Sequence, residues 1–471
     1  MYISKRNFIF AIALLTLLGI VATFILGNDG NISKSYFVIF TFVCNITISL
    51  VCFVKSANKS GYSLNQFFWL FSLFFFGFAA LAQYLTQVYS WNLRPTEIEI
   101  IWTNVFIFVW YMFYAIGGKI RITSTTKTHQ KSDLEVRFCK PALNILLVIS
   151  VLIVIYFMAT IGMNNMLMRG SNRDELLDST ASLIVNHVFR GLLLYNLVIR
   201  IYYIRIFKRG YLGFGLSSIC FLLCCFPFGL SRYMMAAYYG GLIVTIFPDT
   251  YKHKWFSIAI IVGIFILFPA VNIFRDVQKL RDADSVTKLI YDNISGTYLS
   301  GDYDAHQMFI SVQRYVKEYG VTYGRQLMGV FLFFIPRSIW PSKPIGSGAE
   351  VISALDQAEF TNVSAPLVSE FYINFGVIGV ILGAILLGTL SAKFDREYHD
   401  SRRKMSCINV IYPFVVFYFF FLLRGDLMSS FAYTITNVVC GITVYSLCVR
   451  KQWIRRGNTL NKDIPPKNQL G

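Results

Sequence analysis

Long apolar runs alternate with short polar segments along the chain, and this pattern predicts the class of protein. Each run holds about 20 residues, enough for a helix to cross a hydrocarbon core of about 30 Å. Lipid offers the backbone no hydrogen-bonding partner, so each run is expected to be a helix. We therefore expect an all-α polytopic membrane protein with about 12 transmembrane helices. The runs cover residues 7–26, 35–54, 67–89, 99–117, 142–161, 182–206, 211–228, 231–248, 256–273, 368–389, 407–423 and 431–449.

Composition agrees with this class and excludes others. Hydrophobic residues make up 55% of the 471 positions and charged residues 14%, with a mean hydropathy of +0.55. Soluble domains average about 25% charged residues. Disorder, a disulfide scaffold and an ordinary soluble enzyme are therefore excluded. The first apolar run is not followed by a small-residue cleavage site, so we interpret it as a retained helix.

The distribution of Lys and Arg predicts the orientation. Segments that would lie inside carry 25 of the 43 Lys and Arg residues, whereas the short outside segments carry six. The positive-inside rule then places both termini in the cytoplasm. The net charge of +18 comes from loops scattered along the chain, beside anionic lipid headgroups, so membrane lipids are expected partners and nucleic acid is not.

Cysteine and motif patterns point away from metal or cofactor chemistry. Seven of the nine Cys lie within predicted spans, and none has a spacing typical of a metal site. The chain lacks GxxxxGK[ST], GxGxxG and HExxH motifs. Two D-x-D patterns, at 282–284 and 302–304, are rejected as nucleotide-sugar sites because they lie outside the cytoplasm. No metal and no cofactor is expected.

The predicted spans divide the chain into four parts. Residues 1–273 form a membrane domain with nine spans, and residues 368–449 add three more. Between them, residues 274–367 form one large extracytoplasmic loop that is expected to carry active-site elements. It is nearly neutral, with nine basic and ten acidic residues from Arg275 to Pro366. Residues 450–471 are a basic cytoplasmic tail.

Two segments of the large loop have patterns of their own. Residues 304–319 predict an amphipathic helix, which could lie on the membrane interface with a solvated polar face or border a cavity with His306 at its start. Residues 328–335 are apolar but too short to span, and three prolines and Arg337 follow them. This second segment is expected to be re-entrant-like, packed on protein or lining a wet cavity.

Four arginines lie on the predicted outer side, where the positive-inside rule disfavours them. One interpretation is snorkelling or a local ion pair, such as Arg424 with Asp426. The other is a clamp for a phosphate or diphosphate, whose oxygens match the planar guanidinium fork. Glu370, at the outer end of a span, is either a site residue or a satisfied packing contact. The arginines are Arg232, Arg275, Arg337 and Arg424.

Several stretches resemble one known family. The segment GVTYGRQLMGVFLFFIPRSIWPSKPIGSG at 320–348 is similar to the bacterial O-antigen or oligosaccharide repeat-unit polymerases of the Wzy type, and FFIPRSIWPSKP is its most specific part. SRYMMAAYY at 231–239, GDYDAHQMF at 301–309 and the pair at 424–425 also resemble this family. The resemblance covers essentially the whole chain.

The resemblance implies a membrane glycosyltransferase with a glycosyltransferase-C-like fold. It would join oligosaccharide units carried on undecaprenyl diphosphate, at the periplasmic face of the bacterial inner membrane, and expel undecaprenyl diphosphate. A chain-length regulator and a flippase are implied as partners. Two alternatives stay open: an O-antigen ligase with similar chemistry, and a flippase or transporter, although the chain shows no convincing internal repeat.

This chemistry suggests roles for the candidate residues. Negative charge on the leaving diphosphate would be stabilised by Arg232, Arg337 and Arg424, with Arg275 as a fourth candidate. An acceptor hydroxyl must also lose its proton to a base. His306 is the first choice because its ordinary pKa of about 6.5 suits the task. Asp302, Asp304 and Glu370 are the alternatives.

Overall fold

The computed structural model describes residues 35–121, 134–167, 180–249, 254–263, 299–360, 362–401 and 405–453. This part of the chain is mostly helical and contains eight helical segments long and apolar enough to cross a membrane. All eight coincide with predicted spans, which confirms an all-α polytopic membrane protein. They are α2 (Tyr36–Ala57), Leu64–Thr86, α5 (Glu97–Gly117), α6 (Lys140–Thr160), Tyr211–Gly229, α19 (Leu367–Ser401), α20 (Cys407–Arg424) and α21 (Leu427–Cys448).

The other four predicted spans have different outcomes. The sixth is a helix of 28 residues, α9 (Thr180–Phe207), and the eighth is a shorter one, α11 (Arg232–Ile246). Only the start of the ninth is described, as α12 (Lys254–Val262). The first, 7–26, lies outside the described residues. The total of about 12 spans therefore stays a prediction.

The segment Leu64–Thr86 lies at the centre of its half of the bundle. It consists of α3 (Leu64–Phe71), the π-helix η1 (Ser72–Phe78) and α4 (Ala79–Thr86), and it is enclosed by protein on all sides. A helix that is apolar all round is typical of such a buried position. Aromatic rings fix it: Phe68 stacks on Tyr114 with centroids 3.5 Å apart, and Phe75 stacks on Tyr303 at 4.7 Å.

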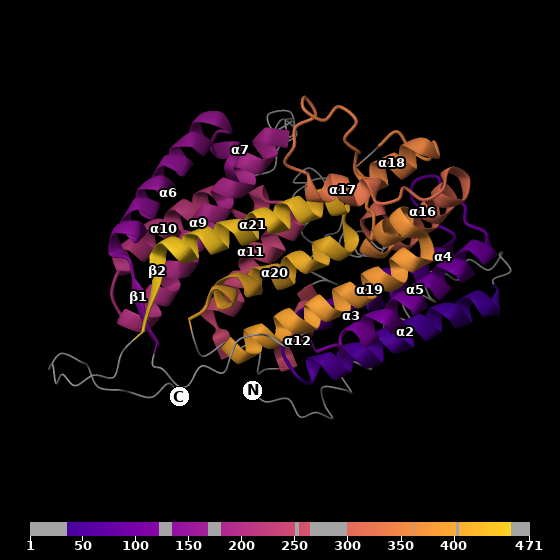
Figure 1. Cartoon of the computed structure of the whole chain (residues 1–471), viewed down its shortest axis with the longest axis horizontal. Coiled ribbons are helices and arrows are strands. Elements are labelled where there is room, and N and C mark those ends of the chain that lie inside the picture. Colours follow the sequence, from indigo (N-terminus) through magenta and orange to yellow (C-terminus); the bar gives the residue numbers. More distant parts are fainter. Residues whose placement is uncertain are drawn as a thin grey trace, which may run out of the picture.

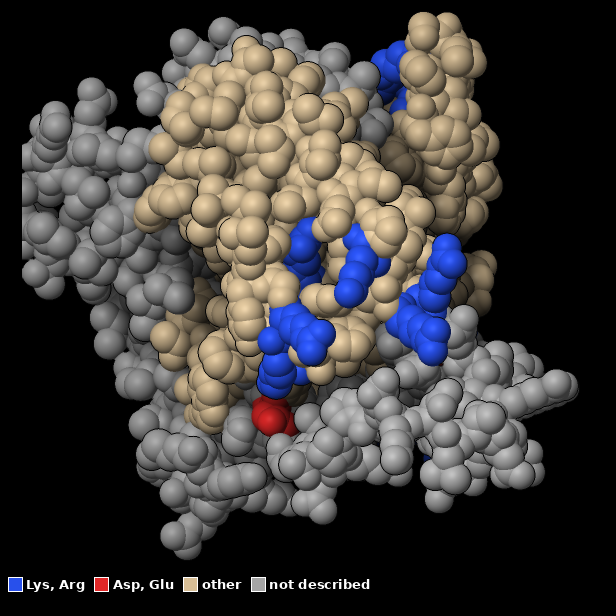
Figure 2. All heavy atoms as spheres, turned by 90° about the vertical axis from the view of Figure 1, so that its left-hand side faces the viewer, with Lys and Arg blue, Asp and Glu red and all other residues tan. Residues whose placement is uncertain are grey.

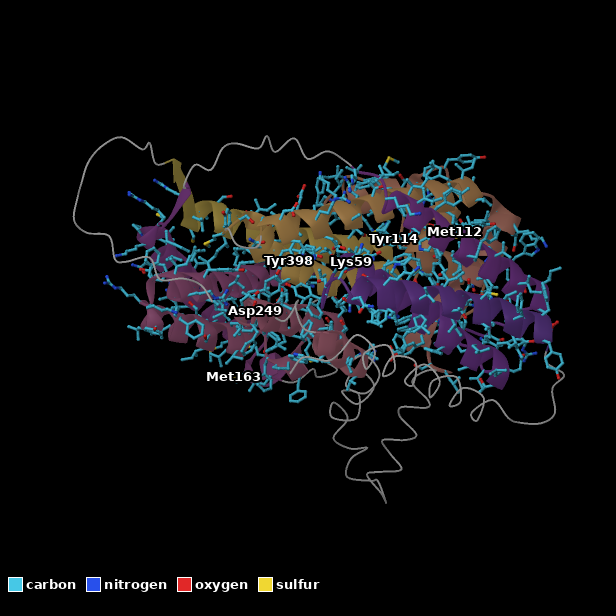
Figure 3. The ribbon with its side chains drawn as sticks, turned by 90° about the horizontal axis from the view of Figure 1, so that it is seen from below. Lys59, Met112, Tyr114, Met163, Asp249 and Tyr398 are labelled. Atoms are coloured by element: carbon cyan, nitrogen blue, oxygen red, sulfur yellow. The ribbon has the colours of Figure 1, made fainter. Side chains whose placement is uncertain are left out.

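The helices form two packed groups (Figure 1). One core contains the helices from α2 through α5 together with α19. The other contains α6, α9, α10 (Tyr211–Cys224), α11 and α21. Helix α20 contributes side chains to both cores. Each helix turns one face inward. On α5, Tyr114 is buried while Met112 is 46% exposed. Figure 3 labels both side chains in a view from below. The exposed apolar faces are those expected to meet lipid.

One end of the bundle is strongly basic. There β1 (Leu134–Phe138) pairs antiparallel with β2 (Val449–Trp453). Because β1 comes just before α6 and β2 just after α21, the pair connects these two helices. Figure 2 shows this end with Lys and Arg side chains gathered on it. We call it the basic end. Its exposed cations include Arg137, Lys140, Lys208, Arg209 and Arg450.

The opposite end carries the described part of the large loop, and we call it the site end. It contains the 3-10 turn η5 (Gly301–Tyr303), α16 (Ala305–Tyr319), α17 (Arg325–Phe331) and α18 (Ser347–Ala354). The helix predicted over 304–319 is therefore present. However, its first eight residues are buried on every side. A helix lying on the membrane interface with a solvated polar face does not describe this half of α16.

Candidate active site

Two arginines from different helices hold one turn at the site end. Arg232, the first residue of α11, donates from Nη1 and Nη2 to both carboxylate oxygens of Asp302, at 2.8 and 2.5 Å. Arg424, the last residue of α20, donates from Nη2 to the carbonyl of Gly301 at 2.8 Å and lies 3.5 Å from Asp304 Oδ1. The fold therefore brings together four residues that the sequence singled out.

Packing around the turn explains this position. Tyr233, next to Arg232, stacks on Phe421 with ring centroids 3.8 Å apart. The start of α11 and the end of α20 therefore lie side by side, at the same height in the bundle. Within the turn, the Tyr303 ring is buried against Phe75, and its carbonyl accepts a hydrogen bond from Gln83 Nε2 at 3.1 Å. The turn is thus fixed on the central helix while the two arginines hold its other side.

The two acids of the turn differ in access. Asp304 is 0% exposed; its Oδ1 accepts from Ser364 Oγ at 2.5 Å and its Oδ2 from Trp91 Nε1 at 2.9 Å. The side chain of Asp302 is 23% exposed, and that of Arg232 21%. A group that reacts with an incoming substrate must be reachable, so Asp302 has the better position of the two.

His306 lies in a closed environment. It is 3% exposed, its Nε2 lies 3.1 Å from Asn104 Oδ1 on α5, and the Phe42 ring is 5.3 Å away. Burial lowers the pKa of His306 to about 3. A base with so low a pKa accepts a proton poorly near neutral pH. Its assignment as the base stays an untested prediction, and this environment suits a packing role better.

Glu370 belongs to a junction of helix ends. It is 1% exposed, and its two oxygens accept from Ser347 Oγ at 2.6 Å and from the amide of Leu427 at 3.0 Å. Nearby, Asp426 accepts from the amides of Met428 and Gly348, at 3.0 and 3.3 Å. The two carboxylates thus meet the amide-bearing starts of α18 and α21, where negative charge is stabilising. The sequence suggested Asp426 as a partner for Arg424; in the structure Asp426 caps α21 and Arg424 pairs with Asp304.

Of the remaining two predicted arginines, Arg337 does not join this cluster. Arg275 lies outside the described residues. Arg337 is exposed in the loop after α17 and donates from Nη1 to the carbonyl of Lys343 at 2.7 Å and from Nη2 to that of Pro344 at 3.2 Å. Its role in a clamp therefore stays a prediction, because its contacts are to its own loop.

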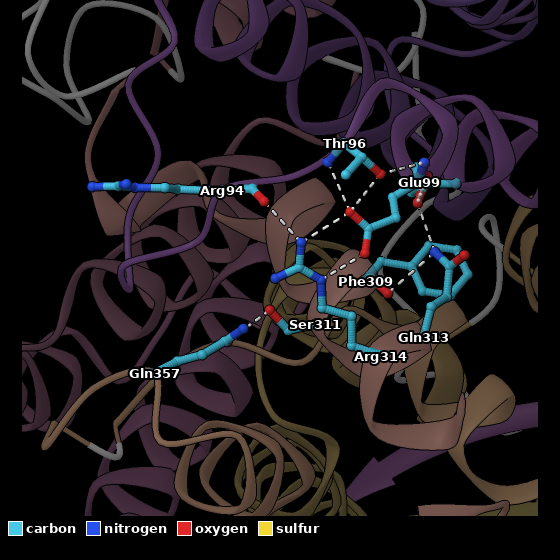
Figure 4. A network of polar contacts seen from close by, with 9 residues as sticks. Arg94, Thr96, Glu99, Phe309, Ser311, Gln313, Arg314 and Gln357 are labelled. Atoms are coloured by element: carbon cyan, nitrogen blue, oxygen red, sulfur yellow. Dashed lines mark hydrogen bonds and ion pairs between the residues drawn. The ribbon is translucent and has the colours of Figure 1, made fainter. Parts of the chain in front are cut away.

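A polar network that sequence reasoning missed fixes α16 to α5 (Figure 4). Arg314 donates to both oxygens of Glu99, at 2.7 and 2.9 Å, and to the carbonyl of Arg94 at 2.8 Å. Gln313 donates to Thr103 Oγ1 at 2.6 Å. The capping pattern Thr96-x-x-Glu99 was readable as a helix start. The partner from α16 was not, because it lies far away in the sequence.

The cluster of Arg232, Asp302, Arg424 and Asp304 can perform two kinds of chemistry. Its guanidinium groups can bind an oxyanion, and Asp302 can accept a proton. Within the described part of the chain, no group of three or more His, Cys, Asp or Glu side chains is arranged to hold a metal ion.

Comparison with known proteins adds one family. Residues 363–453, which include α19, α20, α21 and β2, match the family model described as O-antigen polysaccharide polymerase Wzy. No curated protein and no solved structure gave a match. The matched region contains Arg424 and Glu370 but not the turn at 301–304. Together with the apolar helices, this match supports a Wzy-type O-antigen polymerase family, and so a membrane protein of polysaccharide biosynthesis, for this chain.

Proposed function

We propose that the protein joins lipid-linked oligosaccharide repeat units into O-antigen or a related surface polysaccharide and expels undecaprenyl diphosphate. The observation that carries this proposal is the convergence of Arg232 and Arg424 on one turn, where Arg232 pairs with the partly exposed carboxylate of Asp302 and Arg424 bonds the neighbouring Gly301 carbonyl. A diphosphate leaving group needs cations, and an acceptor hydroxyl needs a base. The family match supports polymerisation as the outcome.

The location follows from the charges at the two ends. The basic end lies in the cytoplasm, in keeping with the positive-inside rule. The site end then faces the outer side of the bacterial inner membrane, and both termini are cytoplasmic. Lipid-linked units already carry an activated glycosyl–phosphate bond, so the reaction needs no nucleotide on that side.

The diphosphate binds to Arg232 and Arg424. In the structure described here, these side chains contact the Asp302 carboxylate, the Gly301 carbonyl and Asp304. A diphosphate carries more negative charge than one carboxylate and fits the planar fork equally well. It therefore displaces Asp302 from Arg232 while Asp304, held by Ser364 and Trp91, stays in place.

Asp302 is then the base. Released from Arg232, its carboxylate accepts the proton of the acceptor hydroxyl as that oxygen bonds to the anomeric carbon. The bond from the anomeric carbon to the phosphate oxygen breaks, and its electron pair leaves with the diphosphate. Arg232 and Arg424 stabilise the charge that develops there, by on the order of a few kcal/mol per donor. His306, Asp304 and Glu370 are less suited because each is buried and hydrogen-bonded.

The test is a gel of surface polysaccharide from cells that lack the gene. With the wild-type gene restored we expect a full ladder; without it, a single capped repeat unit. Restoration with Arg232→Lys, which keeps the charge but loses the fork, should also give the single unit at normal protein level. Arg325→Lys is the matched control, because Arg325 is 52% exposed and pairs with Glu350 at the same end.

Other outcomes of this gel separate the alternatives. If cells without the gene lose even the single capped unit, the protein is a ligase or flippase and polymerisation is the wrong reaction. If they keep the full ladder, the pathway itself is wrong. A chain-length regulator and a flippase are proposed partners, and co-purification from the native membrane tests them.

A further inference from the structure

The loop between α17 and α18 exposes large apolar side chains without forming a helix or strand. We call residues 332–346 the proline wedge. Phe334 is 60% exposed and Ile339 75%, more than most apolar residues on the spanning helices. Figure 1 shows the wedge standing away from the helices, above α17 and α21. Exposed apolar groups gathered on one loop of a membrane protein require an explanation.

Two cationic side chains brace the wedge from within. Arg337 lies in the first half of the loop, which we call its first limb. It donates to the carbonyls of Lys343 and Pro344 in the second half, the second limb. Lys343 reaches back and donates from Nζ to the carbonyls of Phe333 and Ile335, at 2.6 and 3.0 Å. The side chain of Lys343 is buried, and burial lowers its pKa. Each limb thus satisfies backbone oxygens of the other.

Backbone turns satisfy further carbonyls of the same loop. The amide of Ile335 donates to the carbonyl of Leu332, that of Ile339 to Pro336, and that of Lys343 to Trp340, at 3.0 to 3.1 Å. The Trp340 indole Nε1 also has a partner, Ser342 Oγ at 3.0 Å. Together with the bonds from Arg337 and Lys343, these turns pair seven of the 15 backbone carbonyls of the wedge.

The base of the wedge is fixed to the bundle. The Phe331 and Phe333 rings lie 5.7 and 6.4 Å from the ring of Phe431, in the first turns of α21. Pro344 packs on Gly329 of α17 so closely that a side chain there would overlap with it. The wedge therefore leaves the bundle at the level where α21 begins, which is the level of one membrane surface.

From these contacts we infer that the proline wedge inserts Phe334 and Ile339 among the acyl chains of the lipid leaflet at the site end. Irregular backbone is not tolerated within the hydrocarbon itself, so the backbone of the wedge lies at the headgroup level and only these side chains reach the acyl chains. Arg337 and Lys343 pair four of its carbonyls there. Trp340, at the same loop, suits the headgroup level. Arg337 uses two of its five N–H donors on carbonyls, so the others are available to lipid phosphates. The inference does not depend on the proposed reaction.

The test uses a photo-crosslinking amino acid at position 339 of the full-length protein in phospholipid nanodiscs. After irradiation, mass spectrometry measures protein carrying one phospholipid mass. The positive control is position 382 on α19, where Leu382 is 62% exposed on a spanning helix. The negative control is position 359, where Glu359 is exposed on the loop after α18. All three are surface positions, so each variant should fold, as size-exclusion chromatography checks.

We expect the phospholipid adduct at position 339 to match that at position 382. It should exceed the adduct at position 359 at least about tenfold, because burying one Ile side chain changes an equilibrium constant by about that factor. An adduct as scarce as that at 359 would place the tip in water and overturn the inference. Cross-links from 339 to a second copy of the chain, or only to a polyprenyl lipid added to the nanodisc, would also overturn it.

A second variant tests the brace. Lys343→Met keeps the apolar stem but removes both bonds to the first limb, so the phospholipid adduct at 339 should fall severalfold, since each lost bond leaves a carbonyl unpaired. Lys317→Met, at an exposed position on α16, should leave the adduct unchanged. An unchanged adduct in Lys343→Met would show that the brace does not hold the tip in the leaflet. The readout is lipid contact, so it stands or falls independently of polymer formation.

Discussion

Asp302 and Asp304 are two residues apart, yet their surroundings give them different tasks. Asp304 is enclosed by Ser364, Trp91 and Arg424, whereas Asp302 shares a partly exposed pair with Arg232. Asp302→Asn should abolish polymer while the protein stays stable. Asp304→Asn should lower the unfolding free energy by on the order of 3 kcal/mol, because it leaves Arg424 beside an uncharged amide. Surface-polysaccharide gels and thermal unfolding in detergent separate the two effects. Polymer at normal length in Asp302→Asn would exclude Asp302 as the base.

The pair of Arg232 and Asp302 also makes a prediction about ligand binding. If Asp302 competes with phosphate for the Arg232 fork, the Asp302→Asn variant should bind inorganic pyrophosphate about fivefold more tightly. This factor corresponds to the loss of one partly exposed ion pair worth about 1 kcal/mol. Arg232→Lys should bind it more weakly. Calorimetry on the purified protein measures both. Weaker binding to Asp302→Asn would mean that the carboxylate supports the fork instead of competing for it.

His306 predicts a dependence of stability on pH. Its pKa is about 3 in the folded protein and about 6.5 when unfolded, so between these values the unfolded chain holds more protons. The stability contributed by the neutral ring is therefore complete above pH 6.5 and is lost as the pH falls, by up to about 1.4 kcal/mol per unit. Melting temperatures from pH 7 to pH 5 should decline more steeply in wild type than in His306→Asn. Parallel curves would show that His306 titrates normally.

At the scale of elements, contacts between helices position the turn. The network of Glu99, Gln313 and Arg314 holds α16 on α5, and α16 directly follows the turn with Asp302 and Asp304. At the other end of α5, Gly117 and Gly388 let α5 and α19 approach so closely that a side chain at either position would overlap with the backbone of the other helix. Gly379 and Gly383, four residues apart on α19, instead make room for Phe371 of the same helix.

Arg314→Gln tests whether α16 depends on this network. Both charges of the pair are about 30% exposed, at 31% and 29%, so the unfolding free energy should fall by only about 1 kcal/mol. Polymer should shorten or disappear if the turn shifts with α16. Thermal unfolding and gels again provide the measurements. Arg325→Gln removes a comparable ion pair with Glu350 and is the control. Equal effects of both variants on polymer would argue against a special role for the α16–α5 contact.

Sequence patterns predicted the helices better than they predicted which side chains pair with each other, for a physical reason. Lipid permits little besides helices, so an apolar run of suitable length nearly determines its own structure. The partners of the arginines are decided by tertiary packing. Arg232 meets Asp302 across 70 residues, and Arg424 meets Gly301 across 123. The sequence pointed to nearby acids, which were the wrong partner for Arg424. The π-helical turn at Ser72–Phe78 and the pair of β1 and β2 had no readable signal either.

At the scale of the whole molecule, charge separates the two ends. Cations gather around β1 and β2 (Figure 2), while α16, which directly follows the turn with Asp302, lies at the other end (Figure 1). We expect alkaline phosphatase, which is active only outside the cytoplasm, to be active when fused after Gly320 and inactive when fused after Trp453. The reverse pattern would place the candidate site in the cytoplasm, where lipid-linked repeat units at the outer face could not reach it.

The strand pair at the basic end has a consequence for biosynthesis. β1 follows α5, and β2 is the last described segment of the chain, so β1 emerges from the ribosome long before its partner. At about 5–20 residues per second this delay is on the order of tens of seconds. During that time most helices have already entered the membrane, while the hydrogen-bonding edge of β1 remains unpaired. Closure of this pair therefore requires synthesis through Trp453, and a chain terminated before β2 keeps a free strand edge, which in the proposed orientation faces cytoplasmic chaperones and proteases.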